Sequence, residues 1–447
     1  MNTPVRVPLA TQPLSLLQSL AAARRNVLSI LPEIATRQPM VSGRVGIRWH
    51  MVMDPQSLRH ILRDRLADYP KSGVTKTLLR PAIGNSLFIA EGAHWQWQRR
   101  ATAPAFSLRN VRAQGPAMTR AAEATAQRIS AEVGAPLNMF DEMVSATFQV
   151  ISDVTLSGDS GFDRDVVHQA IDDYIESAGR VTLPDMFGLP SWFPRGGWLR
   201  SRRALKAMRN IADTTIEARR DLPPKDVPDL LDLLLNATDP ETGREMTTAE
   251  LRDNLLTFIV AGHETTALTL SWALYLCSID PQAQEKARAE AIDTLQGRAA
   301  AQDDLSALPY TTAIIEEALR LYPPAALVSR TAQKADTLCG REVRPGDTVM
   351  IPIYALHRNH QLWEEPDEFR PERFTEEEGP ERFAYLPFGD GPRICIGQSF
   401  AMQEAVIILS TLLSRFRFSP AWNTPPNPVM LLTLRPEGGV WLKAETV

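Results

Sequence analysis

The chain has 447 residues, of which 44% are hydrophobic and 23% are charged. This is the composition of a folded globular protein, and it excludes a disordered chain, which would lack the apolar content needed to form a core. The formal net charge of −5 argues against a protein that binds nucleic acid through overall positive charge. The length allows two or three domains, and one large domain also fits.

The chain contains three cysteines, at positions 277, 339 and 395, which are too few and too scattered for a disulfide framework. They suit a reducing compartment. Polar residues interrupt the only apolar run near the N-terminus, residues 14–23, and a bilayer span needs about 20 apolar residues. The segment also lacks the basic start of a secretory signal. We therefore expect a cytoplasmic protein without a stable membrane anchor.

Helical patterns dominate, and the short strand-like runs are residues 46–53, 347–353, 429–434 and 440–443. Asp54 and Pro55 end the first strand and begin a helix. The last two strands flank residues 435–439, whose glycines predict a hairpin turn. Residues 116–180 read as helical. Residues 181–200 predict an apolar loop, which is either a packed connection or a mobile lid or contact patch.

A helix of unusual length is predicted from about residue 248 to residue 279. Thr247 followed three residues later by Glu250 is typical of a capping box at a helix start. The segment is apolar on several faces, which predicts burial. A long buried helix in the middle of a domain is a candidate wall of a functional site.

Residues 388–397 read Phe-Gly-Asp-Gly-Pro-Arg-Ile-Cys-Ile-Gly and precede an apolar helix. A thiolate at a helix N-terminus is stabilised by the helix dipole and by free N–H groups. The glycines let the backbone approach a large flat partner, and Arg393 is placed to pair with an anionic group of that partner. On these residues alone, Cys395 could equally be a buried inert cysteine.

This segment resembles the haem-ligand loop of the cytochrome P450 family, Phe-Gly-x-Gly-x-Arg-x-Cys-x-Gly, and the chain is similar to soluble bacterial members from about residue 40 to residue 443. The resemblance implies a mainly α fold with a small β-rich lobe and haem b as the cofactor. It makes Cys395 the axial thiolate ligand of the haem iron, which favours O–O cleavage, and it makes Arg393 a ligand of a haem propionate.

Residues 261–266, Ala-Gly-His-Glu-Thr-Thr, lie in the predicted long helix. A zinc motif would need a second histidine at position 267, which is alanine, so this alternative fails. The segment is similar to the dioxygen-binding helix of the same family. The resemblance implies that Gly262 leaves room for dioxygen, that Thr265 interrupts the helix ladder and holds a water, and that Glu264 supplies protons.

Two further motifs complete the resemblance. Glu317 and Arg320 lie on one helix face, and alone they would be a weak exposed pair. The resemblance joins them to Arg373 in a buried, structural ion-pair network. Trp95 and Arg99 also share a face and are expected against the propionates, although a surface tryptophan packed on an arginine is the alternative. The implied cofactor-binding residues are Trp95, Arg99, Ala261, Gly262, Phe388, Arg393, Cys395 and Gly397.

The resemblance implies monooxygenation of an apolar substrate, driven by NAD(P)H through a separate ferredoxin- or flavodoxin-type donor and its reductase. A haem-thiolate peroxygenase or isomerase and a non-enzymatic haem sensor stay open as alternatives, and the Glu264–Thr265 pair favours the monooxygenase. We expect a monomer with one catalytic domain, residues 40–447, after a segment of unassigned role, residues 1–39. No nucleic-acid partner is expected.

The expected substrate pocket is apolar and consists of Leu87, Phe88, Phe258, Ala326, Leu327, Val328 and Leu431. Arg80 and Arg330 are an alternative, because either one could turn inward and bind a substrate carboxylate. A basic surface for the electron donor is expected behind Cys395, from Arg99, Arg100, Arg109, Arg112, Arg382 and Arg393.

Overall fold

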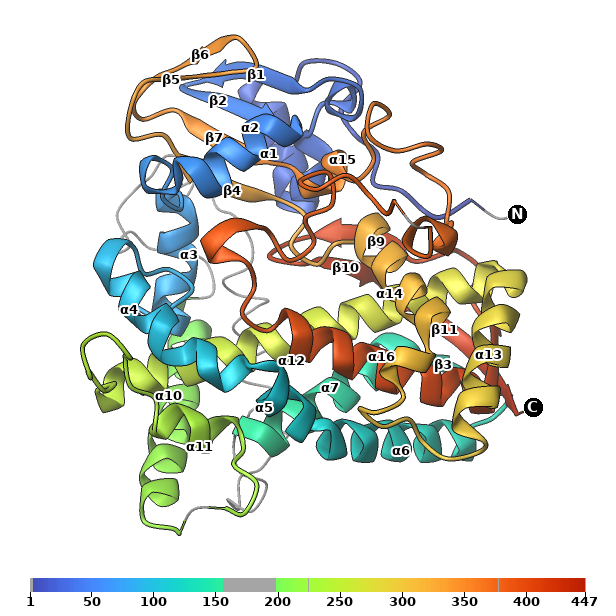
Figure 1. Ribbon diagram of the computed structural model, residues 1–447. Helices are drawn as coiled ribbons and strands as arrows, with labels where there is room; N and C mark the ends of the chain where they lie inside the picture. Colours follow the sequence, from blue (N-terminus) through green and yellow to red (C-terminus); the bar gives the residue numbers. More distant parts are fainter. Residues whose placement is uncertain (1–2, 156–197, 224, 377, 447) are drawn as a thin grey trace.

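The computed structural model describes residues 3–155, 198–223, 225–376 and 378–446. A large helical body occupies the lower part of the view in Figure 1, and a smaller β-rich lobe lies above it. The helices are α1 (Leu16–Arg25), α2 (Pro55–Arg59), α3 (Gly73–Ile83), α4 (Gly92–Thr102), α5 (Leu108–Ala113), α6 (Gly115–Ala131), α7 (Met139–Thr155), α10 (Trp198–Arg220), α11 (Leu230–Leu235), α12 (Thr248–Ile279), α13 (Pro281–Leu295), α14 (Pro309–Leu321), α15 (Ile353–Leu356) and α16 (Gln398–Arg415).

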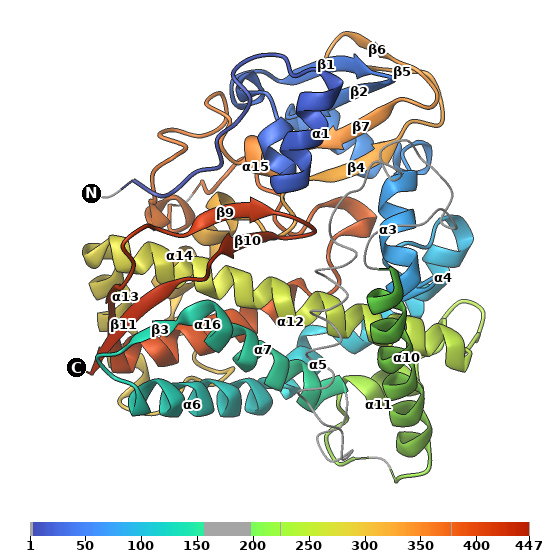
Figure 2. The ribbon, with the colours of Figure 1, turned by 180° about the vertical axis from the view of Figure 1, so that it is seen from behind.

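The centre of the body is α12, the predicted long helix. Its capping box forms as expected: the Glu250 N–H donates to Thr247 Oγ1 at 3.3 Å, and the Thr247 N–H donates to Glu250 Oε2 at 3.0 Å. Figures 1 and 2 show α12 crossing the body with α16 on one side and α7 on the other, and both helices pack against it. Most of α12 is buried, because these neighbours cover its apolar faces.

Within the part of the chain that the structure describes, the strands form four small sheets. Their bounds are β1 (Met40–Val45), β2 (Ile47–Val52), β3 (Pro136–Asn138), β4 (Val328–Thr331), β5 (Asp336–Leu338), β6 (Arg341–Val343), β7 (Thr348–Ile351), β8 (Phe416–Pro420), β9 (Asn427–Met430), β10 (Leu434–Glu437) and β11 (Trp441–Thr446). The main sheet of the upper lobe has the order β1-β2-β7-β4, with only the β2–β7 pair parallel.

The prediction for the C-terminal hairpin is wrong in the position of the turn. The structure splits residues 429–434 between β9 and β10, which pair with each other around a turn at residues 431–433. The final strand β11 pairs with β3 and β8 instead of β10. Leu431 and Leu432 are apolar, so the apolar pattern typical of a strand continues through the turn, and residues 429–434 read in the sequence as one strand.

Residues 3–39 pack onto the rest of the molecule. The Val5 N–H donates to the Tyr275 hydroxyl at 3.1 Å, and its carbonyl accepts from the Tyr322 hydroxyl at 2.8 Å. The Val7 N–H donates to the Tyr354 hydroxyl at 2.9 Å. Within the described ranges, every helix falls short of the length or the apolar character that a membrane-spanning segment needs.

The predicted loop at residues 181–200 lies mostly outside the described residues, so the packed-connection and lid hypotheses are both untested. The part that is described, residues 198–200, differs from the expectation because it is already helical and begins α10. Of the predicted helical stretch 116–180, residues up to 155 form α6 and α7, separated by the short strand β3.

Candidate active site

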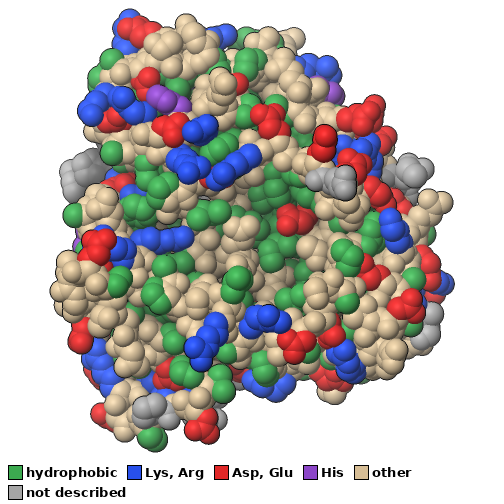
Figure 3. Space-filling view, viewed as in Figure 1, with side chains coloured by type: hydrophobic (Ala, Val, Ile, Leu, Met, Phe, Trp, Pro, Cys, Tyr) green, Lys and Arg blue, Asp and Glu red, His purple; other side chains and the backbone are tan. Residues whose placement is uncertain are grey.

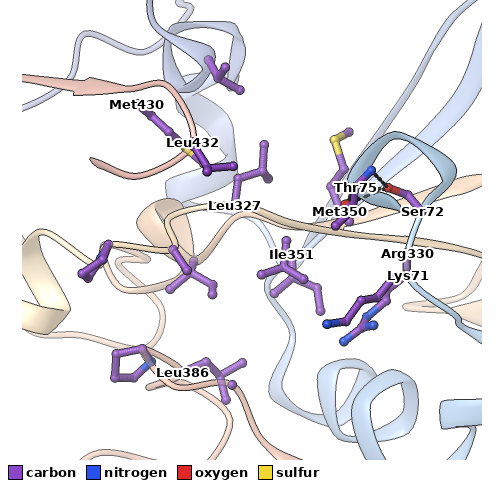
Figure 4. Close-up of a pocket in the computed structure, with 18 of the residues that line it drawn as sticks. Lys71, Ser72, Thr75, Leu327, Arg330, Met350, Ile351, Leu386, Met430 and Leu432 are labelled. Atoms are coloured by element: carbon purple, nitrogen blue, oxygen red, sulfur yellow. Dashed lines mark hydrogen bonds between the residues drawn. The ribbon is translucent and has the colours of Figure 1, made fainter. Parts of the chain in front are cut away.

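A cavity of about 1660 Å³ lies between the β-rich lobe and the helical body. Residues of α12 form one wall, and the segment that leads into α16 forms the opposite wall, with Cys395 on it. Figure 4 shows a further wall, where Leu327, Ile351 and Leu432 lie close together and two cationic side chains point inward beside them. The predicted haem loop and the predicted dioxygen helix therefore face one cavity.

The Cys395 thiol opens onto this cavity at the start of α16. The Cys395 N–H donates to the Phe388 carbonyl at 2.9 Å, which closes the loop, and Gly397 is the N-cap of α16. Burial raises the pKa of the Cys395 thiol, whereas the Gly397 N–H and the charge of Arg99 lower it. A bound metal cation holds such a thiol as the thiolate.

Three of the predicted cofactor residues meet at one side of the cavity. The Arg393 guanidinium lies 4.5 Å from the ring centroid of Trp95 and donates to the Ala90 carbonyl at 3.0 Å. Its other end pairs with Glu91. Arg99, from the same helix as Trp95, lines the cavity as well, and partial burial lowers the pKa of both arginines.

Two cations that sequence reasoning missed or misplaced join this group. Arg330 is 5% exposed, and its Nε and Nη1 atoms have no hydrogen-bond partner among the described residues. Burial, followed by the charge of Arg393, lowers the pKa of Arg330 to about 10. Burial also lowers the pKa of Lys71 well below its usual value. Figure 4 shows both side chains pointing into the cavity together.

These buried cations fit an anionic flat cofactor. A buried charge without a partner is costly, and the Arg330 guanidinium has two such nitrogens among the described residues, so it favours a negative group beside it. Lys71, Arg99 and Arg393 line the same cavity, although Lys71 also donates to the Phe88 carbonyl and Arg393 pairs with Glu91. The two propionates of haem supply such groups, and Cys395 supplies the thiolate. The alternative assignment of Arg330 to a substrate carboxylate is less suited to this placement, and Arg80 is not among the residues that line the cavity.

The α12 motif differs in detail from the expectation. Thr265 does line the cavity, but its hydroxyl donates to the Ala261 carbonyl at 2.7 Å and α12 continues through the motif as an unbroken helix. A side chain at Gly262 would meet the Ile151 side chain at 3.0 Å. Packing against α7 therefore favours a glycine here, because a larger residue would force the Ile151 side chain to shift by a few tenths of an ångström.

Glu264 does not line the cavity. Its side chain is 4% exposed, and its Oε1 atom accepts from the Thr433 hydroxyl at 2.8 Å and from Nε of Arg435. The role predicted for Glu264, the supply of protons, would therefore need a path from this buried position to the cavity. His263 is buried edge-to-face against Phe148, with ring centroids 5.8 Å apart, as expected of a packing residue.

The structure brings Glu317, Arg320 and Arg373 together in a buried cluster. Glu317 and Arg320 are completely buried and make two hydrogen bonds of 2.6 and 2.8 Å to each other. Arg373 Nε lies 3.5 Å from Glu317 Oε1. Arg320 also donates to the carbonyls of His357 and Pro366, which fixes the chain that leads to the loop.

Six of the seven predicted pocket residues line the cavity: Leu87, Phe88, Phe258, Leu327, Val328 and Leu431. Ala326 does not, because it is fully buried and its carbonyl accepts from the Tyr354 N–H at 3.0 Å. The neighbouring Ala325 lines the cavity instead. Met430 and Leu432, on either side of Leu431, extend the same apolar wall (Figure 4).

The predicted basic docking surface is largely paired with acids. Arg100 makes two hydrogen bonds of 2.7 Å to Asp239, and the other pairs are Arg112–Asp303, Arg382–Asp390 and Arg393–Glu91. Figure 3 shows hydrophobic side chains between the lobe and the body on this face, with Lys, Arg and acidic side chains interspersed around them. The pairing reduces the net positive charge that the arginines offer to an acidic protein.

Comparison with known proteins agrees with this geometry. The family model described as cytochrome P450 matches residues 10–442, which includes most of the segment 1–39. Cyclooctatin synthase of Streptomyces melanosporofaciens is 33% identical over 92% of this chain and 90% of its own length. Cyclooctat-9-en-7-ol 5-monooxygenase of the same organism is 33% identical, with 90% and 87% covered. The crystal structure of the cytochrome P450DA heme domain matches with a TM-score of 0.80 and 29% identity over 92% of this chain and 90% of that one. With a cavity that presents Cys395, buried cations and Thr265, the chain belongs to the cytochrome P450 family and is a haem-thiolate monooxygenase.

Proposed function

We propose that the enzyme hydroxylates or epoxidises a neutral, medium-sized to large apolar molecule. The observation that carries this proposal is the division of the cavity into a cationic side, with Lys71 and Arg330, and an apolar wall that includes Leu327 and Leu431. The cations are occupied if haem b is bound, so the substrate faces the apolar wall. A charged substrate group there would lose its hydration without gaining a partner.

The relatives point to the same substrate class. One of them is named as a 5-monooxygenase of cyclooctat-9-en-7-ol, a hydrocarbon-rich alcohol. The small side chain of Ala325 leaves space in the wall for a bulky ring system, and Leu87 and Phe258 supply apolar surface. Burial of carbon contributes about 25 cal/mol per Å², so affinity comes from the size of the buried skeleton.

The chain's own residues divide the work. Trp95 would cover the haem propionates, and four cations would bind them: Lys71, Arg99, Arg330 and Arg393. Haem held by Cys395 supplies the activation of dioxygen. The Thr265 hydroxyl holds water on the facing wall and passes on protons that Glu264 supplies from behind that wall. The apolar wall excludes other water from the reacting carbon.

We also propose a separate ferredoxin- or flavodoxin-type electron donor with its reductase, which draws electrons from NAD(P)H. The support is the face seen in Figure 3, where hydrophobic side chains are exposed among mixed charges. A monomer that acts in the cytoplasm completes the proposal. Residues 3–39 belong to the same packed unit as the catalytic domain, because Val5 and Val7 are hydrogen-bonded to its tyrosines.

Spectroscopy and turnover test the proposed function together. The ferrous–CO complex should show the far-red-shifted Soret band of a thiolate ligand. Cys395→His should lose this band, and Cys339→Ser, a change at the other exposed cysteine, should keep it. Persistence of the band in Cys395→His would refute the ligand assignment. Product that forms with peroxide alone, and never with NAD(P)H and a donor, would favour the peroxygenase alternative.

A ligand panel tests the substrate class. A fatty acid, its methyl ester and a neutral terpenoid are titrated while the Soret band is followed for loss of the iron-bound water. We expect the ester and the terpenoid to bind at least as well as the acid. A shift with the free acid alone, abolished by Arg330→Ala but not by Arg80→Ala, would return Arg330 to the carboxylate-binding role.

A further inference from the structure

The β9–β10 hairpin touches both the substrate cavity and the acid of α12. Met430 at the end of β9 and the turn residues Leu431 and Leu432 line the cavity. Figure 4 shows Met430 and Leu432 at the wall, above Leu327. The next residues along the same hairpin, Thr433 and Arg435, hold Glu264. A few residues of chain therefore connect a substrate-contacting surface to a buried carboxylate.

The side chains that bind the Glu264 carboxylate restrain it strongly, because this carboxylate is buried. Thr433 Oγ1 and Arg435 Nε donate to the same oxygen of Glu264, and the exposed fractions of the Glu264 and Arg435 side chains are 4% and 20%. Removal of one member of a buried ion pair leaves an uncompensated charge, which is far more costly than loss of a surface pair. The position of this carboxylate is thus set by the hairpin.

The ends of the hairpin are fixed, and its turn is less restrained. Asn26 bonds to β9 at two points, the Pro428 carbonyl and the Met430 N–H, at 2.9 and 3.1 Å. In β10 the Leu434 carbonyl accepts from Trp272 Nε1 at 3.2 Å, and the Leu434 N–H donates to the Pro324 carbonyl at 3.1 Å. Between these anchors, Leu431, Leu432 and Thr433 are only half-buried.

We propose that Arg435 and Thr433 are positioning residues that place Glu264 for proton delivery through Thr265, and that substrate in contact with Leu431 and Leu432 adjusts this placement. The inference rests on the proposed function, since it assumes that Glu264 supplies protons. It adds a way in which a substrate bound in the cavity changes the position of the Glu264 carboxylate. The ion-paired Glu264 carboxylate first takes a proton from solvent at the Arg435 side. The resulting carboxyl group gives that proton to water, and water passes a proton to the Thr265 hydroxyl oxygen as the hydroxyl releases its own proton into the cavity.

The test compares Arg435→Ala, Arg435→Lys and Thr433→Val with the wild type and with Arg417→Ala. Arg417 is a matched control, because it pairs with Glu285 at the surface of β8, away from the cavity lining. The readouts are product and peroxide per NAD(P)H consumed, and the dissociation constant of a substrate from the Soret shift. We expect Arg435→Ala to lower product per NAD(P)H by about tenfold or more, with the electrons recovered as peroxide.

Substrate affinity should change much less than product yield in Arg435→Ala, and Arg435→Lys should restore most of the yield. Thr433→Val should give a smaller loss in the same direction, which keeps the test open if Arg435→Ala fails to fold. Unchanged product per NAD(P)H in both Arg435→Ala and Thr433→Val would overturn the inference, as would equal losses in Arg435→Lys and Arg435→Ala. Failure of the proposed function is distinguishable, because the wild type itself would then form no NAD(P)H-dependent product.

Discussion

Glu404 lies in α16 with 1% of its surface exposed, and neither carboxyl oxygen has a hydrogen-bond partner among the described residues. Burial raises the pKa of Glu404 well above its ordinary value of 4.5, and the neighbouring Thr266 hydroxyl opposes this only in part. A carboxyl group in such a site is kept as the neutral acid. We therefore predict that Glu404→Gln, which is also neutral and nearly the same shape, preserves the haem spectrum.

The change also has a signed effect on stability. Between the unfolded-state pKa and the raised folded-state pKa of Glu404, the folded protein binds more protons, so the stabilising contribution of this group is present at low pH and is lost as the pH rises. The loss is about 1.4 kcal/mol per pH unit for one proton. Glutamine does not titrate. The Gln variant should therefore gain on the wild type as the pH rises above about 5, by at most about that amount per pH unit, until the pH reaches the folded-state pKa of Glu404.

Urea unfolding of the holoenzyme between about pH 5 and pH 8, followed by the Soret band and far-ultraviolet circular dichroism, measures this difference. The exposed Glu445→Gln is the matched control and should run parallel to the wild type. Infrared spectra should show a protonated carboxylic acid band that shifts in D₂O and is missing in Glu404→Gln. Parallel stability profiles for wild type and Glu404→Gln, together with no such band, would refute the reasoning.

Three further predictions follow from the site. Thr265→Ala should retain substrate binding but lower product per NAD(P)H by about tenfold in favour of peroxide, whereas Thr265→Ser should not; the same coupling assay measures both. Glu317→Gln should lower the free energy of unfolding by about 3–5 kcal/mol, because it leaves the buried Arg320 without its counter-charge. Urea unfolding of the holoenzyme measures this free energy, and a decrease below about 1 kcal/mol would contradict the prediction. Arg330→Leu should release haem to apomyoglobin about tenfold faster, since a buried charged hydrogen bond is lost; an unchanged rate would remove Arg330 from the propionate site.

Short sequence motifs predicted the parts of the site whose residues lie close together in the chain. The Cys395 loop, the α12 segment and the Glu317–Arg320 pair are short runs, and the structure brings them to one cavity and its support. Lys71 carried no such signal, because its place beside Arg330 arises from a bridge between segments far apart in the sequence. No spacing rule relates two such positions.

The position of Glu264 was within reach of simple geometry. Successive helical residues are rotated by about 100°, so the Thr265 and Glu264 side chains point in directions about 100° apart, and Thr265 lies closer than Glu264 to the direction of Ala261. The motif drew attention to a pair of residue types, and helical periodicity separates the members of that pair. The ion-pair partner of Glu264 is Arg435. The sequence pattern does not reveal this pair, because it places residues 435–439 in the hairpin turn, whereas Arg435 lies in strand β10.

The N-terminal strap formed by Val5 and Val7 has a practical consequence for labelling and purification. Its backbone is tied to Tyr275, Tyr322 and Tyr354, and the Tyr322 ring stacks on Trp272 with centroids 4.0 Å apart. An affinity tag cleaved a few residues too far would strip hydrogen bonds from these buried rings and alter tryptophan emission. A tag at the C-terminal end, after the exposed last residues of β11, would leave the hydrogen bonds of Val5 and Val7 in place.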